Sequence, residues 1–130
     1  MPAMHQIALI AAALAAMIHA YFFVLESLWF MRPDVWRRFG LESDADARTT
    51  RSFAYNQGFY NLFLAVGVAI GVVLDATGDA AAGRAIILFA CGSMVAAGVV
   101  LFANNRSFMR AAAIQAVPPA IAIIGILLPS

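Results

Sequence analysis

The sequence predicts an all-α, polytopic membrane protein: an up-and-down bundle of four transmembrane helices. Hydrophobic residues make up 64% of the 130-residue chain and charged residues only 12%, whereas soluble domains average roughly 45–50% and about 25%. Nine of the fifteen charged side chains lie between Arg32 and Arg51. Outside that segment lie four apolar stretches, and each is long enough to cross a bilayer as a helix, which takes about 20 residues.

The expected spans cover residues 7–30, 53–74, 83–103 and 108–128 of a single membrane domain, residues 1–130. Helices are favoured over a barrel because the short alternating segments of a barrel are not visible in the sequence. Residues 31–52 form a hydrophilic loop between the first two spans. Pro33 interrupts the first helix, and Ser43 with Asp46 resembles a capping box that starts the second helix near Asp44.

Polar residues also mark the two shorter connections. Asp75, Gly78 and Asp79 are expected to form the tight turn after the second span, with Asp79 as the N-cap of the third helix. Ser107 is expected to cap the fourth helix, after the turn that follows the third span. These connections leave no room for a second domain.

The arginines predict the orientation of the chain in the membrane. All eight basic residues are arginines, and seven of them follow the first or the third span, while Arg84 alone follows the second. The positive-inside rule therefore places residues 31–52 and the turn near Arg106 in the cytoplasm, with both termini outside. Abundant alanine and arginine without lysine is typical of GC-rich bacterial genomes, so we expect the inner (plasma) membrane.

Composition also restricts cofactors and partners. A formal net charge of +1 gives no basic excess for nucleic acid. The single cysteine, Cys91, and two histidines do not form a metal-binding pattern. We therefore expect no metal and no cofactor. The expected partners are the lipid bilayer and a small-molecule or lipid ligand, and the GxxxG of Gly67 and Gly71 allows either a homo-oligomer or close packing within one bundle.

Glu26 is the acidic residue that cannot be assigned to a loop. Placing an ionised carboxylate inside a bilayer costs about 3 kcal/mol on insertion scales. Glu26 must therefore face protein, a partner or water, or carry a proton. His19 precedes Glu26 by two helical turns and projects from nearly the same face. The pair is a candidate proton-binding or cation-binding site.

Further polar side chains are expected at the same depth in two other helices. They are Asn56, Gln57, Tyr60 and Asn61 of the second span and Gln115 of the fourth. Amides both donate and accept hydrogen bonds, and aromatic faces flank them. We therefore expect three helices to converge on a buried polar cavity in the cytoplasmic half, with these residues as its walls.

Several of these residues also form recognisable motifs. H-x-Y-F-x-x-L-E over His19–Glu26, N-Q-G-x-Y-N over Asn56–Asn61 and a late Q-x-x-P-x-A from Gln115 resemble the domain of unknown function 1304 family. Members of that family are bacterial and fungal membrane proteins of about the same length as this chain. The resemblance supports the four-span layout and the polar site, but it implies no reaction.

The sequence leaves four functions open, and it favours a protein that is not an enzyme over an enzyme. The first function is binding or transport of a small amphipathic or cationic ligand, in a cavity where Glu26 is the charge partner. A proton-coupled exporter of the small multidrug resistance type also has a glutamate in its first span, but its frequent dual topology conflicts with the arginine asymmetry. An intramembrane isomerase would use Glu26 and His19, which lie about 10 Å apart along the helix axis, as acid and base. In a structural or assembly protein, Glu26 would accept hydrogen bonds from Asn56, Gln57 or Tyr60 as a helix clamp.

Overall fold

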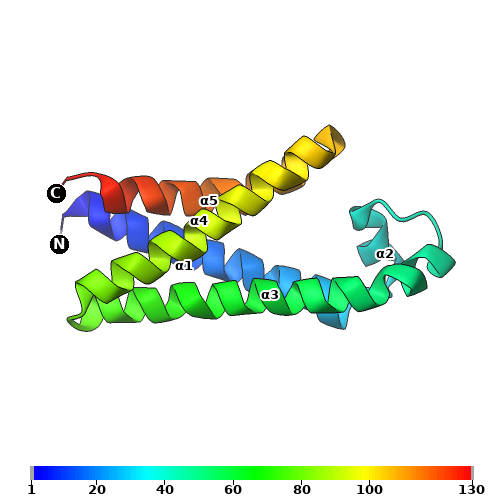
Figure 1. Cartoon of the computed structure of the whole chain (residues 1–130), viewed down its shortest axis with the longest axis horizontal. Coiled ribbons are helices and arrows are strands. Elements are labelled where there is room, and N and C mark those ends of the chain that lie inside the picture. The colour runs from blue at the N-terminus through cyan, green and yellow to red at the C-terminus, as the bar shows by residue number, and fades with distance from the viewer. Residues whose placement is uncertain (1, 130) are drawn as a thin grey trace. The chain divides into compact units, whose positions relative to one another are not determined.

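The computed structural model describes residues 2–129, and every regular element in that range is helical (Figure 1). This confirms the predicted all-α fold class. The long helices are α1 (Ala3–Phe23), α3 (Asp44–Thr77), α4 (Ala80–Asn104) and α5 (Met109–Leu127). The short elements are the π-helical turn η1 (Val24–Leu28), α2 (Pro33–Trp36) and the 3-10 turns η2 (Arg37–Phe39) and η3 (Arg106–Phe108).

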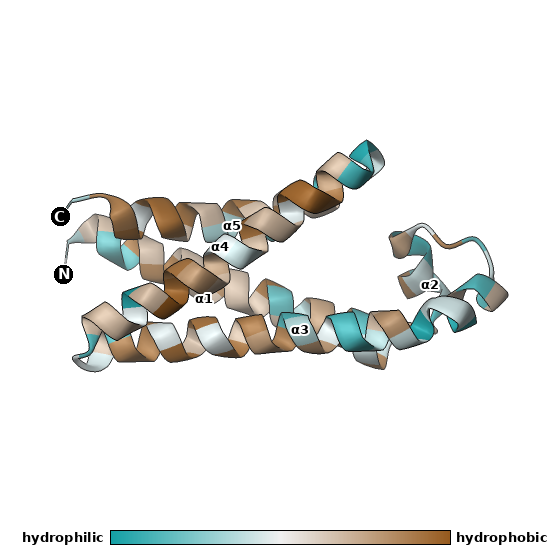
Figure 2. Ribbon diagram, viewed as in Figure 1, coloured by the Kyte–Doolittle hydropathy of each residue, from teal (hydrophilic) through white to brown (hydrophobic). Residues whose placement is uncertain are grey.

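Within the described range, four helical stretches have the length and hydropathy of membrane spans: Ala3–Leu28, Asp44–Thr77, Ala80–Asn104 and Arg106–Leu127. The protein is therefore a multi-pass membrane protein. The hydropathy colouring shows mostly apolar residues along α4 and α5 and polar residues at the start of α3 (Figure 2). Helix α3 has 34 residues, whereas about 20 residues are enough to cross the hydrocarbon core. Its polar first turns therefore extend beyond the apolar stretch.

The chain divides into two compact units, and the boundary falls within α1 and α3. The first unit contains the chain up to Ile18 and from Leu64 onward, and the second runs from His19 to Phe63. The core of the first unit is built from small and aliphatic side chains of all four long helices. It comprises Ala11, Ala12, Ala15, Val68, Ile87, Ala90, Cys91, Met94 and Ala122. Small side chains let helices approach closely, which is how helices associate in a bilayer.

Glycines mark the closest approaches between helices in this unit. A Cβ on Gly83 of α4 would lie 2.6 Å from the carbonyl oxygen of Gly71 on α3. A Cβ on Gly125 of α5 would lie 2.7 Å from the Cβ of Ala8 on α1. Gly67, in contrast, has open space beside it. Of the GxxxG pair, Gly71 therefore serves packing within the chain.

The second unit contains a smaller core of aromatic and alanine side chains, formed by Phe30, Trp36, Ala47 and Ala54. Pro33 occupies the first turn of α2, where its missing N–H costs nothing. Gly40 ends η2 in the left-handed region at φ 83°, which glycine adopts without strain. The backbone N–H of Asp46 donates to Ser43 Oγ at 3.1 Å, so α3 begins with the expected cap.

The turns bear out one prediction and correct two. Asp79 caps α4, because its carboxylate accepts from the N–H of Ala82 at 3.2 Å. Asp75 is not in the turn: α3 continues through Thr77, since no residue before Gly78 breaks it. Ser107 does not cap α5. It lies inside η3 and donates to Asn105, whose side chain caps that turn instead.

Candidate functional site

Glu26 lies in the π-helical turn that follows α1. The N–H of Trp29 donates to the carbonyl of Val24 at 2.9 Å, five residues back, which closes the wider π-helical ring. Such turns are rare, appear mostly as single insertions in α-helices and are frequent at functional sites. The turn changes the helical phase between His19 and Glu26, so the two-turn spacing no longer fixes a shared face.

The Glu26 side chain is buried against α3 and is held there by a neutral amide. The residue is 7% exposed, and Asn61 Nδ2 donates to its Oε1 at 2.7 Å. None of the ion pairs described between residues 2 and 129 includes Glu26. Its described partner therefore supplies a hydrogen bond but no positive charge.

Gly58 allows the π-helical turn to lie this close to α3. Ser27 Oγ donates to the carbonyl of Tyr55 at 2.7 Å. A Cβ on Gly58 would lie 1.9 Å from Ser27 Oγ and 3.0 Å from Ser27 Cβ. Asn61 follows Gly58 by three residues, on the same side of α3. The glycine and the second asparagine of the N-Q-G-x-Y-N motif thus act together to position Glu26.

We expect Gly58→Ala to lower the free energy of unfolding by about 1–2 kcal/mol, because Ser27 must abandon its bond to Tyr55 and the π-helical turn must shift. Gly67→Ala is the matched control in the same helix, since open space lies beside Gly67. The measurement is the unfolding transition in mixed micelles of increasing sodium dodecyl sulfate. Equal transitions for the two variants would show that the close approach at Gly58 contributes nothing.

The other predicted site residues have different positions. His19 is buried in α1, with its ring edge-on to Phe22 at a centroid distance of 5.2 Å. Asn56, Gln57 and Tyr60 are exposed on α3, and Gln115 is half-buried on α5 in the first unit. The structure thus joins Glu26 to Asn61, rather than to the three side chains expected for a clamp.

A regular spacing in α3 explains why Asn61 is the amide that reaches Glu26. From Ala54 onward, buried positions recur every three or four residues along the helix: Ala54, Gly58, Asn61, Ala65, Val68, Gly71 and Asp75. Asn56, Gln57 and Tyr60 fall between these positions. This stripe is visible in the sequence as a row of mainly small residues, and it also includes Asp75.

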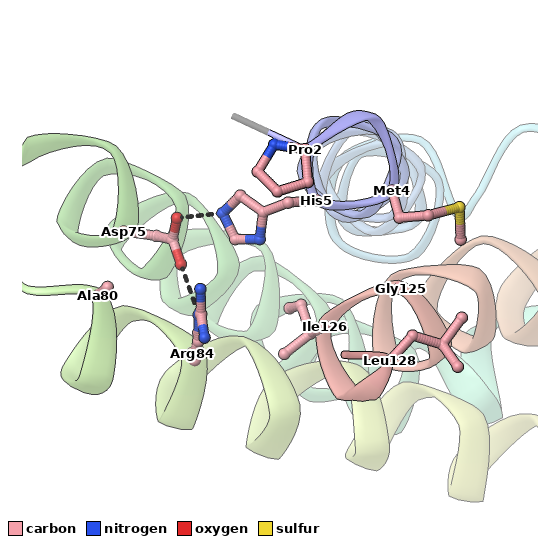
Figure 3. A pocket seen from close by; sticks show the side chains of 9 residues that line it. All are labelled: Pro2, Met4, His5, Asp75, Ala80, Arg84, Gly125, Ile126 and Leu128. Carbon is pink, nitrogen blue, oxygen red and sulfur yellow. Dashed lines mark hydrogen bonds and ion pairs between the residues drawn. The ribbon is translucent and has the colours of Figure 1, made fainter. Parts of the chain in front are cut away.

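Asp75 forms a second polar cluster, which sequence reasoning missed. Its side chain is 2% exposed, and each of its oxygens has a partner. His5 Nε2 of α1 lies 2.6 Å from Oδ1, and Arg84 Nε of α4 lies 3.4 Å from Oδ2. The close-up shows the carboxylate between the imidazole and the guanidinium (Figure 3). The cluster joins three helices of the first unit.

A cavity of about 230 Å³ adjoins this cluster. Its lining, seen in Figure 3, consists of Pro2, Met4, His5, Asp75, Ala80, Arg84, Gly125, Ile126 and Leu128. None of the residues singled out from the sequence as site candidates lines it. The lining combines one arginine, one histidine and one carboxylate with aliphatic side chains near both ends of the described chain.

The fold and these two clusters define an all-α, multi-pass membrane protein with buried acidic groups in its helices. The family described as Protein of unknown function (DUF1304) matches residues 13–127, and the chain belongs to this family. This confirms the resemblance drawn from the sequence motifs. No match was found among curated proteins or among solved structures.

Proposed function

We propose that the protein binds a small cationic or amphipathic ligand within the membrane, with Glu26 as its charge partner. The observation that carries this proposal is a buried carboxylate whose described partner, Asn61, is neutral. A buried carboxylate is tolerated only when it is paired with a positive charge or carries a proton. A site of this kind can therefore exchange a proton for a cation.

The local backbone supports the same proposal. A π-helical turn costs regular hydrogen bonding, and such turns are frequent where a side chain must be directed to a site. Between residues 2 and 129, π-helical winding occurs only over Val24–Leu28, the five residues that include Glu26. An acidic residue inside a membrane span marks a candidate functional site by default. The same unit contains the aromatic rings of Phe23 and Phe59, whose centroids lie 5.1 Å apart.

The proposal includes an orientation in the inner membrane. The arginine-rich segment Arg32–Arg51 and the turn around Arg106 would lie in the cytoplasm, and both termini outside. Exposed Arg37 and Arg38 in η2 fit a position at the level of lipid headgroups. Glu26 would then lie in the cytoplasmic half, with Asn61 beside it and His19 deeper in α1.

The test uses tetraphenylphosphonium, a lipophilic cation, and purified full-length protein in lipid nanodiscs. Wild-type protein is expected to bind it saturably, and Glu26→Gln is expected to weaken binding about tenfold or more, because the amide keeps the size of the side chain and removes its charge. Glu42→Gln, the same substitution at an exposed glutamate, is the matched control. Triphenylphosphine oxide, a neutral aromatic probe, should bind both variants equally.

Unchanged tetraphenylphosphonium affinity in Glu26→Gln would overturn the proposal. A loss of affinity for the neutral probe as well would also contradict it, since a charge partner discriminates by charge. In either case the helix clamp formed by Glu26 and Asn61 would account for the buried carboxylate.

A further inference from the structure

We infer that the cavity beside Asp75 is a second binding site, one that takes a small oxyanion joined to an apolar tail, with Arg84 as its charge partner. The cavity lies within the first unit, and Pro2 and Leu128 in its lining place it near both ends of the described chain. It is formed without any contribution from Glu26 or Asn61. The inference is therefore independent of the function proposed above.

The geometry of Asp75 directs the site toward anions. A cation would need a carboxylate oxygen, but the Asp75 side chain is 2% exposed and both of its oxygens already contact His5 or Arg84. Asp75 is thus enclosed and positions its two basic partners. Asp75, His5 and Arg84 all line the cavity, and Arg84 is the cationic side chain of that lining.

Arg84 has the geometry that an oxyanion requires. Its described contact with Asp75 is through Nε, so that contact does not use the two terminal nitrogens of the guanidinium. The side chain is half exposed, at 50%. The planar guanidinium fork binds carboxylates and phosphates through paired N–H groups.

The remaining lining points to an apolar tail on the ligand. Met4, Ile126 and Leu128 supply the aliphatic part of the cavity lining, and in Figure 3 the side chains of Met4 and Leu128 extend away from the charged groups. Sites for drug-sized ligands measure roughly 300–1,000 Å³, so the cavity holds an anionic headgroup and the first part of a chain. The chemistry fits a membrane amphiphile, such as a fatty-acid carboxylate or a lipid phosphate, and its polar part also fits a soluble oxyanion.

The test is equilibrium binding of radiolabelled laurate and of radiolabelled inorganic phosphate to the full-length protein in phosphatidylcholine nanodiscs, with empty nanodiscs subtracted. Wild-type protein is expected to bind laurate saturably, and Arg84→Gln to weaken that binding about tenfold. Arg84→Lys, which keeps a charge beside Asp75 but loses the fork, should give an intermediate affinity. Arg106→Gln, at an exposed arginine in η3, is the matched control and should bind laurate as wild type does.

The two probes separate the sources of the anion. Saturable laurate binding without phosphate binding assigns the site to a membrane amphiphile, and comparable phosphate binding that Arg84→Gln also weakens assigns it to a soluble oxyanion. Absence of saturable binding of either probe would overturn the inference. Equal affinities for wild type and Arg84→Gln, or an equal loss in Arg106→Gln, would do so as well. Glu26→Gln should leave laurate affinity unchanged, which keeps this result separate from the cation test.

Discussion

Replacing Gly83 with valine is expected to lower the free energy of unfolding by about 3 kcal/mol, the upper part of the range for overpacked sites. A Cβ at this position would lie 2.5 Å from the backbone nitrogen of Asp75 and 2.6 Å from the carbonyl oxygen of Gly71. Both atoms belong to the backbone of α3 and cannot move aside as a flexible side chain could. The two helices must therefore separate, which also opens the core around Ile87.

Gly92→Val is the control for that prediction, because Gly92 lies in the same helix with open space beside it. Its effect should stay within about 0.5 kcal/mol, as for other substitutions away from packed contacts. The measurement is the midpoint of unfolding in mixed micelles of rising sodium dodecyl sulfate content. Similar midpoints for the two variants would mean that α3 and α4 are not packed at Gly71 and Gly83.

The second large effect is expected in the Asp75 cluster. The double variant His5→Leu with Arg84→Met removes both partners of a carboxylate that is almost fully enclosed. Removing the partners of a buried charge costs about 3–5 kcal/mol because the charge is left uncompensated, and we expect a loss of about 3 kcal/mol here.

Adding Asp75→Leu to that double variant should restore most of the lost stability. Replacing every member of a buried ionic cluster with apolar residues of similar volume is often neutral or stabilising. Thermal unfolding of the double and triple variants, in the same detergent as wild type, gives the comparison. A triple variant less stable than the double one would show that the cluster does not act as a compensated buried charge.

The fold could be predicted from the sequence because a bilayer leaves few options. Four apolar stretches of sufficient length, separated by charged or proline-containing segments, permit only helices in the hydrocarbon. The local signals at Ser43 and Asp79 also gave correct helix starts, since capping depends on a few neighbouring residues. Ser107 misled because Asn105, two residues earlier, captures its N–H and hydroxyl.

The candidate sites could be predicted only in part. Glu26 was recognised because an acid in an apolar stretch is costly wherever it lies. Which neighbouring amide contacts Glu26 depends on the helical phase, and that phase is determined by the π-helical turn and by the close approach at Gly58. The sequence predicts a turn at Asp75 because Gly78 and Asp79 follow it closely. Its pairing with His5 joins residues 70 positions apart, which no local pattern reveals.

A charge partner must contact its ligand, and infrared difference spectroscopy shows whether the Glu26 carboxyl group contacts the bound cation. Spectra of the Glu42→Gln protein, with carbon-13 in its glutamate carboxyl group, would be recorded before and after addition of tetraphenylphosphonium. In this variant Glu26 is the remaining glutamate. We predict that the labelled carboxyl band shifts on addition of the cation and that Glu26→Gln with Glu42→Gln shows no such shift. A labelled band that stays unchanged while the cation binds would contradict the account.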